Sequence, residues 1–370
     1  MVTRTPSAAR VLSRFAGALD EDRNVVETID VAAEALLSAV PADVWCAVVL
    51  DPSTLLDTGG VHRAGFPAEV MPRLFEIEHA EQDDVDNLRA LTRRTAPVSL
   101  LSRSTGGDLA TSKYYREILA PLRLADELRV LLRDGEHTWG LLVLCRSAGS
   151  PAFSDAELSV AAEVSRPVTV AARRSLLLTG VDDGLVDDAP GVVMLAADGT
   201  LLSVSPTAGA WLDQLGEVRT GGLPHPVRAV VAAAHAAPDA SAWSRVRTPA
   251  GTWATIRAWR MSGPAGGGTV ISVGPAEPGE LTAIVLDAYG LTPRERDVTQ
   301  LVLLGRSGAQ IGDRLGLSVY TVQDHLKSVF DKTGVRSRRD LVSHLFTRHY
   351  LPQLQQPSLS LDGRRHPAPE

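Results

Sequence analysis

Gln323, Asp324 and Lys327 lie on one flank of a helix that the sequence predicts over residues 319–333, and their side chains are suited to reading base edges. Glutamine can form a bidentate pair of hydrogen bonds with adenine, and lysine favours guanine, when a helix lies in the major groove. Tyr320 shares this outward flank. The spacing therefore predicts a helix whose polar side is free to contact another molecule.

The opposite flank of the same helix is apolar. Val322, Leu326, Val329 and Phe330 recur at spacings of three and four, which is the period of a helix that buries one face. The side chains suited to holding phosphate groups around this helix are Thr321, His325, Lys332 and Arg338.

Four capping signals divide this part of the chain into short helices. They are Thr292 with Glu295, Ser307 with Gln310, Ser318 alone, and Ser337 with Asp340. Gly316 permits a sharp turn between the second and third helices, which leaves the three-residue turn of a helix-turn-helix.

Charge is distributed unevenly along the 370 residues. Residues 1–290 carry 25 Lys and Arg against 36 Asp and Glu, a net −11, whereas residues 291–351 carry 10 against 6, a net +4. Two of the three lysines, Lys327 and Lys332, fall in the basic segment. An acidic body with a basic terminal module indicates that this module alone binds a polyanion.

Residues 1–178 have the pattern of an α+β domain. Helical periodicity fills residues 7–40 and 65–95, WCAVVLD indicates a buried strand, and LRVLLRDGEHTWGLLVLCR predicts two strands joined by a tight turn. Ser154 caps a further helix that continues toward Leu178.

A second α+β unit is predicted over residues 189–276, after an acidic, glycine-containing linker at residues 179–188. It begins with a strand, an Asp-Gly turn, a strand and a helix, and WSRVRTPAG, TWATIRAWRM and GGGTVISVG predict three more strands. No internal repeat is evident, and residues 353–370 have the composition of a disordered tail.

The segment LTPRERDVTQLVLLGRSGAQIGDRLGLSVYTVQDHLKSVFDKTGVRSRRDL, with these caps, stripes and glycines, resembles the LuxR-type helix-turn-helix domain of bacterial transcription regulators. The resemblance implies a recognition helix, base contacts through Gln323, Asp324 and Lys327, and dimer contacts through the last helix. Gln323, Gln310 and Gly312 stand where the family usually has lysine, glutamate and alanine. The operator sequence therefore stays open.

We expect this domain over residues 281–352 as an all-α bundle of four helices. The residues predicted to contact DNA are Ser318, Tyr320, Thr321, Gln323, Asp324, His325, Lys327, Lys332, Arg336 and Arg338. Those predicted to form dimer contacts are Val342, Leu345 and Phe346.

The upstream regions carry weaker resemblances. Residues 25–178 resemble a GAF domain, most clearly in LADELRVLLRDGEHTWGLLVLCR, and residues 185–275 resemble a PAS domain from GVVMLAADGTLLSVSPTAGAWL onward. Both resemblances imply a sensory or dimerising role, with a small-molecule ligand in either region. The expected fold class is multidomain: an α+β GAF-like domain over residues 1–178, an α+β PAS-like domain over residues 189–276, and the four-helix domain.

Cys46 and Cys145 are the only cysteines, so a disulfide framework and a four-cysteine zinc site are excluded. If the first sheet follows the GAF order, the strands that carry them are antiparallel neighbours, and a thiol oxidoreductase or redox sensor is the alternative function. His62 and His79 are imaginable metal ligands, but no ligand-like spacing joins them. No metal is therefore expected.

The sequence contains none of the common catalytic motifs. The sequence has no GxxxxGK[ST] and no kinase, metalloprotease or nucleophile-elbow signature, and the segment around Lys113 does not suit a receiver domain. We expect no enzyme, no catalytic residue and no cofactor. With no secretory signal and no run of about 18 apolar residues, the expectation is a cytoplasmic transcription regulator that binds double-stranded DNA as a homodimer without membrane contact.

Overall fold

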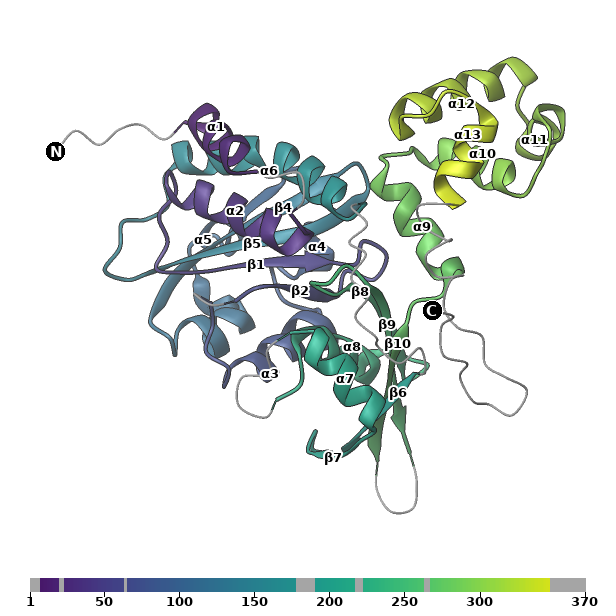
Figure 1. Ribbon diagram of the computed structural model, residues 1–370. Helices are drawn as coiled ribbons and strands as arrows, with labels where there is room; N and C mark the ends of the chain where they lie inside the picture. Colours follow the sequence, from purple (N-terminus) through teal and green to yellow (C-terminus); the bar gives the residue numbers. More distant parts are fainter. Residues whose placement is uncertain are drawn as a thin grey trace. The chain divides into compact units, whose positions relative to one another are not determined.

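The computed structural model describes residues 7–19, 23–62, 65–177, 190–216, 222–262 and 267–346. The chain divides into two compact units, Met1–Ala276 and Glu277–Glu370. Among the described residues, the first unit holds two antiparallel sheets with their helices and the second holds helices alone, as labelled in Figure 1. The predicted linker at residues 179–188 and the predicted tail at residues 353–370 lie outside the described residues.

The first sheet has the strand order β2-β1-β5-β4-β3, and every neighbouring pair is antiparallel. Its strands are β1 Val44–Leu50, β2 Asp57–Val61, β3 Val98–Leu100, β4 Leu124–Asp134 and β5 His137–Ser147. The predicted long hairpin is formed by β4 and β5, and Gly135 lies in its turn with a φ of 59°. This left-handed conformation favours glycine, which has no Cβ to crowd the backbone.

Six α-helices and three short helical turns accompany this sheet. They are α1 Ala8–Ala18, α2 Val25–Leu37, α3 Met71–Phe75, η1 Glu76–Glu81, α4 Leu88–Leu91, α5 Leu101–Ser104, η2 Leu109–Thr111, η3 Tyr115–Leu119 and α6 Asp155–Ser175. The predicted cap of α6 is confirmed as a capping box, because Ser154 and Glu157 each accept a hydrogen bond from the other's backbone N–H.

The first sheet is covered on both faces. On one face, α1, α2 and α6 pack together, with α2 against β1 and α6 against β4 (Figure 1). On the other face, Leu131, Val143 and Cys145 share an apolar cluster with Ile118 and Leu119 of η3. Strands buried on both faces need apolar residues at nearly every position, which is why β5 contains an almost continuous apolar run from Trp139 to Cys145. β4 departs from this pattern, because Glu127 and Arg129 are buried within it as charged residues.

The second sheet has the order β7-β6-β10-β9-β8, which repeats the connectivity of the first sheet. Its strands are β6 Gly191–Ala196, β7 Leu201–Val204, β8 Ser241–Arg247, β9 Trp253–Met261 and β10 Gly268–Pro275. All five lie where the sequence predicts strands, and Gly199 supplies the left-handed residue of the predicted Asp-Gly turn with a φ of 83°. The described residues of this region therefore form a second α+β region within the first unit.

One face of the second sheet is covered by α7 Pro206–Gln214 and α8 His225–Ala236, whose apolar side chains cluster with Ile256 and Ile271. The opposite face carries four large apolar side chains that are 39–44% exposed. They are Val192, Met194, Trp243 and Trp259. The two sheets thus share a strand order and differ in how their faces are covered.

The two sheet regions share part of their core. Leu56, Met71 and Phe75 of the first region belong to the same apolar cluster as α8 and the second sheet. Nearby, the Asp51 carboxylate accepts hydrogen bonds from the Arg245 guanidinium at 2.8 and 2.9 Å and from its backbone N–H at 3.0 Å. These side chains are 0% and 2% exposed. No sequence signal pointed to this buried ion pair, because its partners lie 194 positions apart.

The sequence did not predict β2, β3 or α8, nor the short helical segments α5, η2 and η3. β2 contains Gly59 and Gly60, which are poor strand formers, yet a Cβ at position 60 would lie 2.1 Å from the Ala47 carbonyl oxygen. The glycine allows β2 to approach β1. β3 has only three residues, and α8 had a usable signal, since Pro226 stands in the first turn of an alanine-rich segment.

The second unit contains five described helices. They are α9 Pro278–Ala288, α10 Pro293–Leu303, α11 Gly308–Leu315, α12 Val319–Thr333 and α13 Arg338–Leu345. The sequence predicted the last four, and their caps are confirmed at Thr292, Ser307, Ser318 and Ser337. α9 is an addition to the predicted four-helix bundle and begins ahead of residue 281.

Specific polar contacts hold α9 in this unit. The Asp287 carboxylate lies 2.6 Å from the Arg296 guanidinium of α10, and the Tyr289 hydroxyl lies 2.9 Å from Nε2 of His344 in α13. Within the described ranges, none of the helices combines the length and the apolar character that crossing a bilayer requires.

Candidate nucleic-acid interface and buried polar cluster

The orientation of α12 is set by the core of its unit. Val322 and Val329 of α12 are 0% exposed, as are Val298, Ile311 and Leu341 of the helices around it. Gly316 ends α11 with a φ of 66°, and the Ser318 hydroxyl accepts a hydrogen bond from the Thr321 N–H at 3.1 Å to begin α12. The three residues between the helices form the predicted turn.

The polar flank of α12 is exposed, as predicted. Tyr320 is 81% exposed, and Gln323, Asp324 and Lys327 are also exposed. Ser318 and Arg336 are exposed, whereas Thr321 and His325 are half-buried. A helix with this face outward can be laid in a groove without any rearrangement of its core.

Lys332, a predicted phosphate contact, forms an ion pair inside the domain. Its Nζ lies 2.6 Å from Oε2 of Glu295. The same oxygen accepts a hydrogen bond from the Thr292 N–H, and Oε1 of Glu295 accepts one from the Ser328 hydroxyl. Burial acts to raise the pKa of Glu295, but these partners outweigh burial and lower it to about 2. This cluster ties α10 to α12, so Lys332 helps to hold α12 in place as well as adding positive charge.

Arg338, another predicted phosphate contact, donates a hydrogen bond to the carbonyl oxygen of Arg306, which lies between α10 and α11. Of the predicted dimer residues, Val342 and Phe346 are 36% and 46% exposed. Leu345 is 1% exposed, so the prediction for this residue is corrected: its side chain is part of the domain core. A residue on the inner flank of α13 has no surface to offer a partner.

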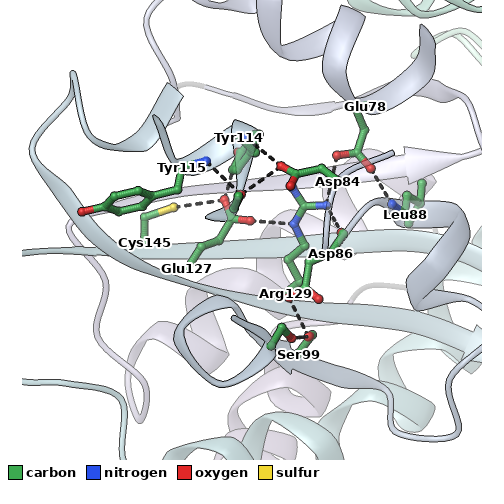
Figure 2. A network of polar contacts seen from close by, with 12 residues as sticks. Glu78, Asp84, Asp86, Leu88, Ser99, Tyr114, Tyr115, Glu127, Arg129 and Cys145 are labelled. Carbon is green, nitrogen blue, oxygen red and sulfur yellow. Dashed lines mark hydrogen bonds and ion pairs between the residues drawn. The ribbon is translucent and has the colours of Figure 1, made fainter. Parts of the chain in front are cut away.

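The first sheet carries a buried cluster of charged side chains, drawn in Figure 2. The Arg129 Nε lies 2.6 Å from Oε1 of Glu127, and its Nη1 lies 3.0 Å from Oε2 of Glu78 and 2.9 Å from the Asp86 carbonyl oxygen. Its guanidinium also lies 4.9 Å from the centre of the Tyr114 ring. Burial acts to lower the pKa of Arg129, but Glu127 and Glu78 raise it well above its usual value.

Asp84 fixes the segment that carries Tyr114 in the same region. Its carboxylate accepts hydrogen bonds from the backbone N–H groups of Lys113 and Tyr114 and from the Ser112 hydroxyl. These bonds lower its pKa despite the opposing effect of burial. The cavity enclosed by this cluster has a volume of about 10 Å³, which is room for one water molecule.

The two cysteines lie on neighbouring antiparallel strands, as predicted, with Cys46 opposite Val143 and Cys145 opposite Val44. Both are free and buried. Burial, followed by the charge of Glu127, raises the pKa of each thiol. Reactive cysteines have a lowered pKa, so the environment here is the opposite of the one that thiol chemistry requires.

The geometry of α11 and α12 defines a helix-turn-helix domain. Residues 290–345 match the sequence model of the family described as bacterial regulatory proteins, luxR family. This segment is therefore a LuxR-type helix-turn-helix domain, as the sequence predicted.

Two relatives illustrate the extent of sequence similarity. The chain is 34% identical over 80 residues to the transcriptional regulatory protein MctR of Rhizobium johnstonii, a match covering 22% of this chain and 37% of MctR. It is 38% identical over 65 residues to the monoamine regulon transcriptional regulator of Klebsiella aerogenes, covering 18% and 27% of the two chains. The chain thus spans less than two fifths of each of these relatives.

Solved structures show weak likenesses. The VqsR LBD domain from Pseudomonas aeruginosa has 18% identity and a TM-score of 0.32, with 45% of this chain and 95% of that chain covered. The GAF domain/HD domain protein from Geobacter sulfurreducens has 21% identity and a TM-score of 0.29, with coverages of 42% and 94%.

Proposed function

We propose that the protein is a transcription regulator that binds double-stranded DNA through α12. The observation that carries the proposal is the exposed polar flank of this helix, with Gln323 and Lys327 directed away from a core that is already complete. The LuxR-type domain match supports the same function. In this proposal, Gln323, Asp324 and Lys327 face base edges, while Thr321, His325 and Arg336 lie near phosphates.

We propose further that the protein acts in the cytoplasm as a homodimer whose contacts include Val342 and Phe346 on α13. Both side chains are apolar and exposed. Two copies related by a two-fold axis recognise two half-sites, which lie about one helical turn of DNA apart, or 34–36 Å. The DNA site is then a two-fold symmetric sequence.

The two sheet regions are proposed to control this binding as GAF-like and PAS-like sensory domains. The matching strand order of the two sheets supports a common architecture for both regions. A small-molecule ligand in the first region would occupy the position of the polar cluster around Arg129, and its entry would require this cluster to open. We assign no catalytic step to either region.

The proposal is tested by selecting bound fragments from a random or genomic duplex library with the full-length protein at low salt. The expected result is a single symmetric motif, bound with an affinity that falls steeply as salt increases because counterions are released from the phosphates. Failure to enrich any duplex would overturn the proposal. A matched selection with Asp331→Asn, an exposed residue of α12 outside the proposed base contacts, should return the same motif.

A further inference from the structure

Asp57, His62 and His225 each bring one potential metal-ligand atom to a common point, where these atoms lie within 4.8 Å of one another. Asp57 is the first residue of β2, His62 follows that strand, and His225 is the first residue of α8. The cluster therefore draws on both sheet regions of the first unit. The sequence indicated His62 as an imaginable ligand but gave no signal for His225, because α8 lies far along the chain.

One ring nitrogen of each histidine in this cluster is buried without a hydrogen-bond partner in the described part of the chain. Nε2 of His62 and Nδ1 of His225 form no hydrogen bond with any described residue. Nε2 of His62 lies 4.0 Å from Oδ2 of Asp57, and the two imidazole rings meet edge to face with their centres 4.0 Å apart. The other Asp57 oxygen, Oδ1, accepts a hydrogen bond from the Gly59 N–H at 2.7 Å, which fixes the carboxylate.

Two imidazole nitrogens and one carboxylate oxygen form a donor set that suits Zn²⁺ and related first-row divalent ions. We propose that Asp57, His62 and His225 bind one such ion, with water completing its coordination. Metal–ligand bonds of about 2.0–2.2 Å place ligand atoms roughly 3–3.5 Å apart, so the three side chains close by about 1 Å on binding. The side chain of His62 is 22% exposed, so the cluster lies close to the surface although Nε2 itself is buried.

The surrounding charges are compatible with this assignment. Each histidine of the cluster keeps one ring nitrogen without a hydrogen-bond partner among the described residues, and such a nitrogen can bind an ion. Arg228 contributes a positive charge near His225, and Asp57 supplies the carboxylate that offsets it. Burial raises the pKa of Asp57 to about 7, so deprotonating this carboxyl group is a cost that the bound ion must offset.

The competing explanation is that the cluster is only packing. The ring of Phe75 lies edge to face with that of His225, with centres 5.6 Å apart, and stacks on His79 at 5.4 Å. Packed rings alone predict no preference among cations. A metal site predicts that transition-metal ions bind, that hard cations do not, and that the bound ion joins β2 to α8.

The full-length protein, free of affinity tags, is stripped with a chelator and titrated with ZnCl₂ and NiCl₂ by calorimetry, with MgCl₂ as the hard-cation comparison. We expect one Zn²⁺ per chain, a rise in the melting temperature because the ion binds only the folded state, and no response to Mg²⁺. An anomalous-scattering peak from a Zn²⁺-soaked crystal should lie between the three side chains.

Asp57→Asn is the sharpest variant, because an asparagine can keep the bond to the Gly59 N–H while losing the negative charge. It should weaken Zn²⁺ binding at least tenfold, and the double variant His62→Ala with His225→Ala should abolish it. His137→Asn, in the β4–β5 hairpin, should bind as the parent does. Absence of one-to-one binding by the parent, or a peak elsewhere, would assign the cluster to packing. The proposal is independent of DNA binding, so neither result bears on the regulator function.

Discussion

The cluster around Arg129 and the outer flank of α12 both contain charged side chains, but the first is buried and the second is exposed. Glu127 and Arg129 are 2% and 6% exposed in their side chains, and each is paired. Gln323 and Lys327 are exposed on a helix whose apolar flank is already buried. In the cluster around Arg129, the charged groups are paired with one another and stabilise the fold. On the outer flank of α12, the polar side chains are exposed and can contact another molecule. Polar residues therefore mark a binding surface only where the core is complete without them.

Arg129→Met should have the largest effect on stability. It leaves Glu127 and Glu78 buried without their cation, and breaking a buried pair in this way costs about 3–5 kcal/mol. Urea unfolding followed by circular dichroism measures the loss. The matched control is Arg103→Met, which removes an exposed pair with Asp155 and should cost less than about 1 kcal/mol. Equal losses of unfolding free energy in the two variants would contradict the expectation that buried charge pairs matter more than exposed ones.

Glu295→Gln should lower the stability of the helical unit by about 1–3 kcal/mol at pH 7. The folded-state pKa of Glu295 is about 2, below the ordinary value of 4.5. Its contribution is therefore fully present above about pH 5 and is lost as the pH falls from about 4.5 toward 2. Unfolding measured across this range should show a weaker pH dependence in the variant. If the free energy of unfolding depends on pH equally in the parent and the variant, the pair between Glu295 and Lys332 does not contribute to stability.

Lys327→Ala should reduce affinity for the selected duplex by about 5- to 150-fold, which corresponds to about 1–3 kcal/mol. Because this side chain is exposed, stability should change by less than about 0.5 kcal/mol. Gln323→Ala should lower discrimination at a single base position. Fluorescence anisotropy with matched and mismatched duplexes separates these outcomes. A large loss of stability in either variant would place the α12 flank in the same class as the Arg129 cluster.

Val342→Glu should have the smallest effect on folding, again below about 0.5 kcal/mol, because the side chain is 36% exposed. Its expected effect is on association: a charge in an apolar contact should shift the protein from dimer to monomer in sedimentation experiments. Ser343→Glu places the same charge on the next exposed residue and should leave the dimer intact. Dissociation by both substitutions would indicate general repulsion.

Much of the fold followed from local signals. The caps at Thr292 and Ser307, the stripe of α12 and the long β4–β5 hairpin are decided by residues within a few positions of one another. β2 was missed because Gly60 is there for close approach to Ala47, a requirement set by another strand. α9 was missed as part of the helical unit because Asp287 finds its partner, Arg296, only after folding.

The sites show the same division. The exposed flank of α12 was predictable because helical periodicity separates its apolar and polar sides without reference to the rest of the chain. The engagement of Lys332 with Glu295 and the burial of Leu345 were not predictable, because both depend on how α10 and α13 pack. A basic residue in a motif does not reveal whether it already has an internal partner.

The sequence by itself determined the helix-turn-helix, the polar face of α12 and the two α+β regions, since these rest on periodicity, caps and turn residues that act locally. Only the tertiary structure decided that the two sheet regions share a core, that Asp51 pairs with Arg245 and that His225 joins Asp57 and His62. The physical reason is that burial and pairing between residues more than 150 positions apart are set by the packing of whole elements, which no local pattern records.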